Sequence, residues 1–174
     1  MAVRPKSKRD TKRVSRIVLD AGGRVEGRTK LQKMAYLMEV TGLGEGFAFG
    51  YRRYGPYSEE LESAARTEEL FGNLKEEEHP TTWGGFYSIY TVADQTSETS
   101  ERTELARIAA DASSVELELA ATAVFLAARG VEDPWAETAR RKPKKANETR
   151  LNNAKQLYKK LQCVETPKPL PAIV

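Results

Sequence analysis

Cysteine and histidine are nearly missing from this 174-residue sequence, which contains only Cys163 and His79. A single cysteine excludes an internal disulfide framework and is typical of proteins in a reducing compartment. One cysteine and one histidine are also too few ligands for a zinc site. We therefore expect no catalytic centre, no metal site and no cofactor, and we expect the protein not to be an enzyme.

Long apolar runs are absent as well. The longest, Leu119–Ala128, is interrupted by Thr122 and is much shorter than the roughly 20 residues that cross a bilayer. The basic segment Met1–Arg16 is not followed by the apolar stretch of a signal peptide. No glycine-rich loop of the Walker or dinucleotide-binding type occurs. These absences predict a cytoplasmic protein that does not contact a membrane.

Charge is distributed unevenly along the chain. Residues 1–16 contain seven Lys and Arg against one Asp, and residues 140–161 contain nine against one Glu. The segment between them, 17–139, contains eleven basic and twenty-two acidic residues. Two basic ends therefore flank an acidic body, which favours contact with a polyanion or with a charged protein surface.

Hydrophobic periodicity predicts a mainly α fold. The N-terminal half, 10–94, reads as helix, helix, strand, helix and then a β hairpin over 74–92, an order that resembles a winged helix. The other half, 103–161, reads as a helical bundle on which the first half packs, with its most apolar helix from Ser113 to Arg129. We expect one domain over 10–161, a basic flexible arm at 1–9 and a proline-rich tail at 162–174.

The densest group of aromatic residues lies between Phe47 and Ser58, which holds five of the fourteen in the chain. Phe47, Phe49 and Tyr51 alternate with small residues and predict a strand. Gly55 and Pro56 are expected to end that strand at a sharp corner. Ser58 then caps a helix over 58–71, whose inward side is expected to carry Leu61, Ala64, Ala65, Leu70 and Phe71.

Two motifs in the N-terminal half resemble a known family. Gly27–Leu37, with the core Leu-Gln-Lys-Met, together with Tyr54-Gly55-Pro56-Tyr57-Ser58 is similar to the paired signature of YwgA-like bacterial proteins. It also resembles, more distantly, the SocA-like antitoxin domain, called Panacea, and the likeness covers roughly 10–161. The antitoxin branch implies neutralisation of a toxin by direct protein contact, whereas the YwgA-like branch implies no known activity.

This resemblance suggests a protein partner, such as a toxin encoded by a neighbouring gene, and an antitoxin or adaptor function. The candidate contacts are aromatic residues around the corner and acidic residues of the following helix, which we expect to be exposed. They are Tyr51, Tyr54, Tyr57, Glu59, Glu62, Glu68 and Glu69. The alternative is that this helix only presents a solvated face.

A DNA-binding regulator is the second hypothesis, because basic residues mark the second helix, the aromatic segment and both ends. If the second helix entered a DNA groove, its lysines would contact phosphates. The candidates are Arg4, Lys6, Lys8, Arg9, Lys30, Lys33, Arg52, Arg53, Arg140, Arg141, Lys142, Lys144 and Lys145. Ordinary solubilising charge explains them equally well, and the sequence fixes neither the partner nor the oligomeric state.

Overall fold

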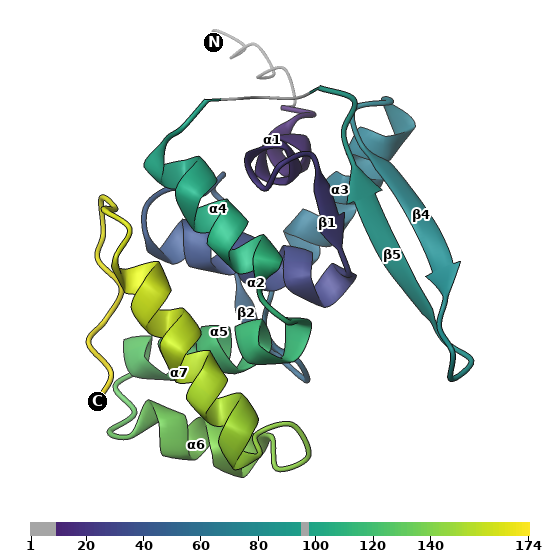
Figure 1. Ribbon diagram of the computed structural model, residues 1–174. Coiled ribbons are helices and arrows are strands. Elements are labelled where there is room, and N and C mark those ends of the chain that lie inside the picture. The colour runs from purple at the N-terminus through teal and green to yellow at the C-terminus, as the bar shows by residue number, and fades with distance from the viewer. Residues whose placement is uncertain (1–9, 95–97) are drawn as a thin grey trace, which may run out of the picture.

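The computed structural model describes residues 10–94 and 98–174. The mainly α fold is confirmed, because these residues form seven helices and two small antiparallel sheets (Figure 1). In chain order the elements are α1 (Arg13–Asp20), β1 (Arg24–Glu26), α2 (Arg28–Val40), β2 (Gly50–Arg52), β3 (Gly55–Tyr57), α3 (Glu59–Leu70), β4 (Lys75–Pro80), β5 (Phe86–Thr91), α4 (Glu101–Asp111), α5 (Ser114–Ala128), α6 (Pro134–Arg141) and α7 (Glu148–Gln162).

The larger sheet has the strand order β1-β5-β4, with all strands antiparallel. The predicted hairpin is present as β4 and β5, and Figure 1 shows its tip projecting beyond the helices. Strand β1 was not predicted, because the sequence indicated only a connection between the first two helices. Its middle residue, Val25, is buried and pairs with Tyr90, but three residues are too few to display an alternating pattern.

The predicted strand over Phe47–Tyr51 is wrong in its position. Strand β2 begins only at Gly50, and the expected corner is itself the strand β3, with Tyr51 opposite Pro56. The two strands are joined by Arg53 and Tyr54, and Gly55 follows with a φ of 88°. A side chain at Gly55 would be strained by this φ, and its Cβ would lie 2.5 Å from Thr122 Oγ1 on α5.

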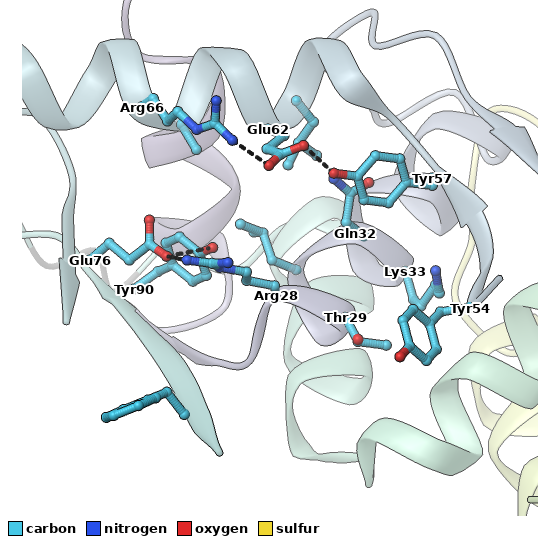
Figure 2. A pocket seen from close by; sticks show the side chains of 14 residues that line it. Arg28, Thr29, Gln32, Lys33, Tyr54, Tyr57, Glu62, Arg66, Glu76 and Tyr90 are labelled. Carbon is cyan, nitrogen blue, oxygen red and sulfur yellow. Dashed lines mark hydrogen bonds and ion pairs between the residues drawn. The ribbon is translucent and has the colours of Figure 1, made fainter. Parts of the chain in front are cut away.

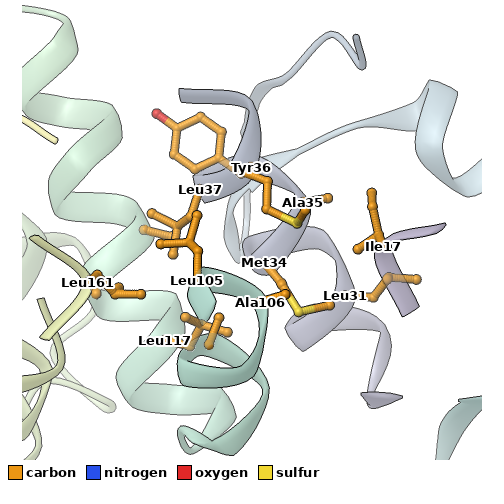
Figure 3. Packing of buried hydrophobic residues seen from close by; sticks show 14 of the residues in the cluster. Ile17, Leu31, Met34, Ala35, Tyr36, Leu37, Leu105, Ala106, Leu117 and Leu161 are labelled. Carbon is orange, nitrogen blue, oxygen red and sulfur yellow. The ribbon is translucent and has the colours of Figure 1, made fainter. Parts of the chain in front are cut away.

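Helix α5 lies at the centre of the second half, as its apolar sequence predicts. Its residues from Leu117 to Leu126 are all buried, and it packs against α2, α6 and α7. Figure 3 shows Leu37 of α2 meeting side chains of α4, α5 and α7. The two halves therefore share one continuous cluster of buried side chains.

The proline-rich tail has no helix or strand beyond Gln162, but it is packed against the body. The Lys168 amide donates a hydrogen bond of 2.9 Å to the Thr41 carbonyl at the end of α2. Leu170 is buried, and the Tyr158 hydroxyl donates to the Pro171 carbonyl. No helix among the described residues is long and apolar enough to cross a membrane.

The predicted exposure of Glu68 is wrong, since only 1% of this residue is accessible. Its carboxylate accepts hydrogen bonds of 2.8 Å from the amides of Val14 and Ser15. Helix α1 has no capping side chain of its own at Lys12, so a residue 54 positions away satisfies its first amides. A carboxylate there also complements the positive end of the helix dipole.

The predicted inward positions of Leu70 and Phe71 are also wrong, because the buried face of α3 includes Glu68 instead of these two residues. Leu61, Ala65 and Glu68 are spaced i, i+4 and i+7, so they share the buried face of α3. Leu70 and Phe71 fall outside that face and are 88% and 67% exposed.

Replacing Glu68 with Ala should destabilise the protein by about 2 kcal/mol, because two buried amides lose a charged acceptor. The neighbouring Glu69 is exposed, so Glu69→Ala is the matched control and should change stability little. Urea unfolding measures both variants. Equal stability of the two would contradict the capping role of Glu68.

Candidate functional site

The two sequence motifs contact each other through adjacent residues of α2. The Gln32 side-chain amide donates to the Ser58 carbonyl at 3.0 Å, and its oxygen accepts from the Ser58 amide at 2.8 Å. The Lys33 ammonium donates to the Pro56 carbonyl at 2.6 Å. These three bonds are buried. One turn of α2 thereby fixes β3 and the start of α3, where Ser58 Oγ accepts from the Leu61 amide as the predicted cap.

The predicted exposure of Lys33 is therefore wrong, because only 1% of this residue is accessible. Burial lowers the pKa of its ammonium group to about 8. The nearest source of negative charge is Glu118 of α5, which opposes this shift, while Lys142 and Lys145 reinforce it. A lysine held in this way does not extend from the protein surface, so it is not available to the phosphates of a DNA duplex.

Glu118 is the buried carboxylate of this cluster, with a side chain that is 2% exposed. Its two oxygens accept from the ammonium groups of Lys142 and Lys145, each at 2.7 Å. Lys142 also donates to the Arg53 carbonyl at 3.3 Å. Both lysines follow α6 in the chain, so Glu118 holds this basic segment against α5, and Lys142 links the segment to the β2–β3 turn.

A pocket of about 520 Å³ opens between the first turns of α2, helix α3 and the β4–β5 hairpin (Figure 2). Leu31, Leu61 and Ala65 give it an apolar lining. Two ion pairs stand in its walls: Arg28 with Glu76 at 3.0 Å, and Arg66 with Glu62 at 2.5 Å. The remaining lining residues include Thr29, Gln32, Lys33, Tyr54, Tyr57, Phe86 and Tyr90.

Tyrosine hydroxyls complete the polar walls of the pocket. Tyr57 donates to Glu62, and Tyr90 donates to Glu76 at 3.3 Å. Burial, together with Glu62, raises the pKa of Tyr57 to about 12. Both carboxylates of the pocket are thus bound to an arginine and a tyrosine, and they contribute no free negative charge to its interior.

Around the pocket, α3 and the hairpin present acidic and apolar side chains that we call the α3–hairpin surface, of which Glu62 and Phe86 also line the pocket. Its acidic side chains are Glu59, Glu62 and Glu69 of α3 and Glu77 and Glu78 of β4, and all of them are exposed except the half-buried Glu62. Its exposed apolar side chains are Leu70, Phe71, Trp83, Phe86 and Tyr87.

The second helix is not available as a reading helix for DNA. All residues of α2 from Leu31 to Met38 are buried, and the Lys30 ammonium donates to the Ala110 carbonyl at 2.8 Å. Lys142, another candidate, is 7% exposed and bound to Glu118. The predicted phosphate contacts of Lys30, Lys33 and Lys142 are therefore corrected, since these ammonium groups have partners inside the protein.

The other basic candidates gather with two tyrosines at the β2–β3 turn and the α6–α7 connection, which we call the basic surface. The Arg141 guanidinium lies 5.1 Å from the ring centre of Tyr51, and the Lys145 ammonium lies 4.5 Å from that of Tyr54. Exposed side chains contributing to this surface are Tyr51, Arg52, Arg53, Tyr54, Arg140, Arg141 and Lys144. Arg4, Lys6, Lys8 and Arg9 lie outside the described residues.

Part of this basic charge is neutralised locally. Glu137 binds both Arg140 and Arg141, at 2.6 and 2.7 Å, and these contacts lower its pKa to about 2. Arg52 is paired with Glu59. The basic surface is therefore less positive than its sequence suggests.

The functional residues not predicted from the sequence are Gln32, Arg66 and Glu76, which line the pocket, and Glu118, which binds Lys142 and Lys145. Only Glu118 carried a signal, as a carboxylate directly before the most apolar run of the chain. Within 10–94 and 98–174, no three His, Cys, Asp or Glu side chains are grouped to hold a metal ion. A scan of protein-family models finds no match to this chain, and a search of curated proteins finds none either.

The buried Lys33 should make stability depend on pH. The unfolded chain keeps the Lys33 proton up to its ordinary pKa of 10.5, whereas the folded chain loses it near 8. Between these values the unfolded state binds more protons, so wild-type stability should rise with pH by an amount on the order of 3 kcal/mol. Lys33→Met should remove this increase.

Urea unfolding of the wild type and of Lys33→Met, from pH 7.5 to pH 10.5, measures that difference. Lys144→Met is the control, because Lys144 is exposed and should leave the pH dependence of the wild type intact. A constant difference between the wild type and Lys33→Met across this range would show that Lys33 is not desolvated.

Proposed function

We propose that this chain is a non-enzymatic interaction protein that binds a protein partner through the α3–hairpin surface, as an antitoxin or an adaptor. The observation that carries the proposal is the combination of five acidic residues with large exposed apolar side chains on two elements, α3 and the hairpin, that border the same pocket. Exposed apolar groups rimmed by charge mark protein interaction sites.

The N-terminal half has the element order helix, strand, helix, two short strands, helix and hairpin, and we assign it to the winged-helix class on that order, with β2 and β3 as an insertion between its helices. In a DNA-binding protein of this kind, the position of α3 would be that of the recognition helix and the hairpin would be the wing. Here both elements carry an excess of acidic residues, Glu59, Glu69, Glu77 and Glu78, although Glu59, Glu77 and Glu78 are paired with Arg52, Lys75 and Arg28. DNA phosphates would be repelled from this surface, which favours a basic protein surface as the partner.

Charge and apolar contact would have separate roles in such a complex. The glutamates would speed encounter with a basic partner and orient it, while a few buried aromatic side chains would provide most of the binding energy. Trp83 and Phe86 on the hairpin are 84% and 71% exposed, which are the highest exposed fractions among the aromatic side chains of the described residues. We therefore assign them as the anchors.

The antitoxin activity rests on the resemblance of Gly27–Leu37 and Tyr54–Ser58 to the SocA-like and YwgA-like proteins. The Gln32 and Lys33 bonds to Ser58 and Pro56 give both motifs a structural purpose. On this proposal the motifs build a scaffold, and the partner contacts the surface beside them. A toxin encoded by a neighbouring gene would be the partner.

The alternative function is nucleic-acid binding, which the gathering of Arg53, Arg141, Lys144 and two tyrosines on the basic surface favours. It would use loops and side-chain stacking, since α2 is buried. Such binding would weaken steeply with salt, with a log–log slope of about −0.9 for each neutralised phosphate of duplex DNA. No gel shift with DNA or RNA at low salt would exclude it.

Co-expression with the product of the neighbouring gene, followed by size-exclusion chromatography, tests the main proposal. Changing Glu59, Glu62 and Glu69 to Lys should slow association by about tenfold or more, because steering is lost. Trp83→Ser with Phe86→Ser should instead speed dissociation. Glu132→Lys is the control for charge, since Glu132 is exposed and lies outside the α3–hairpin surface.

Growth of the cells that co-express both proteins gives a second measurement. An antitoxin should relieve growth inhibition caused by the neighbouring product, whereas an adaptor should bind it without any such inhibition. If the product neither co-elutes nor inhibits growth in a way that this protein relieves, the proposed partner is wrong.

A further inference from the structure

Lys33 is a buried cation with an incomplete set of partners. Its ammonium group has three N–H donors, and its one hydrogen-bond acceptor among the described residues is the Pro56 carbonyl at 2.6 Å. The buried carboxylate that faces it, Glu118, is already bound by Lys142 and Lys145. Burying a charge without a counter-ion is unfavourable, so this site is electrically unbalanced.

The pocket of about 520 Å³ reaches Lys33. Its other charged lining residues cancel in pairs, because Arg28 binds Glu76 and Arg66 binds Glu62. Lys33 is therefore the one positive charge in excess in the lining. A ligand with a single negative charge would balance the pocket, whereas a doubly charged phosphate would leave it negative.

The first turn of α2 favours an anion in the same place. Its N-cap residue, Gly27, makes no side-chain hydrogen bond, and both Arg28 and Thr29 line the pocket. The start of this 13-residue helix carries partial positive charge and unpaired amides. Thr29 in this first turn and Lys33 are spaced i, i+4 on α2 and both line the pocket, so the helix start and Lys33 border the same space.

We propose that this pocket binds a small monocarboxylic acid with an apolar body, either aromatic or branched aliphatic. The carboxylate would accept from the Lys33 ammonium, and the apolar body would lie against Leu31, Leu61 and Ala65. The volume is within the range of about 300–1,000 Å³ found for small-molecule sites. The site does not depend on the protein partner proposed above.

The affinity for such an acid should depend on pH through Lys33. The charged groups that act on Lys33 are Glu118 of α5 and Lys142 and Lys145 of the α6–α7 connection. The pKa of free Lys33 is about 8, so the binding-competent ammonium is the major form below this pH. Affinity should be constant there and fall by about tenfold per pH unit above it.

Isothermal titration calorimetry on the full chain tests the site with defined probes: phenylacetate and 3-methylbutanoate, with phenylacetamide as the neutral counterpart. We expect both acids to bind and the amide to bind about tenfold more weakly, a difference of about 1.4 kcal/mol. Lys33→Met should reduce affinity for phenylacetate to that for the amide. Lys30→Met on the same helix is the matched control and should bind as the wild type does.

Ala65→Leu should weaken the acid and the amide alike, because the added methyl groups occupy the apolar lining without changing charge. The comparison of acid with amide on the wild type needs no variant, so it holds even if Lys33→Met does not fold. Three results would each overturn the proposal: no binding of either acid at millimolar concentration, equal binding of phenylacetate and phenylacetamide, or wild-type affinity in Lys33→Met.

Discussion

The structure depends on the contact between one turn of α2 and the backbone from Pro56 to Ser58. The Gln32 side chain pairs with both the amide and the carbonyl of Ser58, and Lys33 binds the Pro56 carbonyl. A buried backbone group without a partner is costly, so this contact leaves little freedom at the start of α3. The direction of α3 in turn sets the width of the pocket and the position of the α3–hairpin surface.

Two buried carboxylates bind partners inside the protein and so determine which charged residues remain exposed. Glu68 holds the first amides of α1, and Glu118 holds Lys142 and Lys145. Each of them links segments that are distant in sequence. As a result the surface is divided: acidic and apolar on α3 and the hairpin, basic and aromatic at the β2–β3 turn and the α6–α7 connection. This division favours a basic protein over DNA as the partner of α3.

Most of the helices, the hairpin over 74–92 and the cap at Ser58 could be predicted from the sequence, because they depend on local spacing and local hydrogen bonds. The burial of Glu68, Lys33 and Lys142 could not, because periodicity treats every charged residue as exposed. Their partners lie 23 to 89 positions away. The pocket escaped prediction for the same reason, since its lining comes from residues between Arg28 and Tyr90 that only the fold brings together.

Native-state hydrogen exchange at the Ser58 amide tests the contact with Gln32 most directly. The account predicts that this amide is as strongly protected as the amides of α5 in the wild type. In Gln32→Ala its exchange should accelerate by orders of magnitude more than that of α5, because the start of α3 would open locally. If the Ser58 amide exchanges rapidly in the wild type, or if Gln32→Ala changes it no more than α5, the contact does not hold the structure together as described.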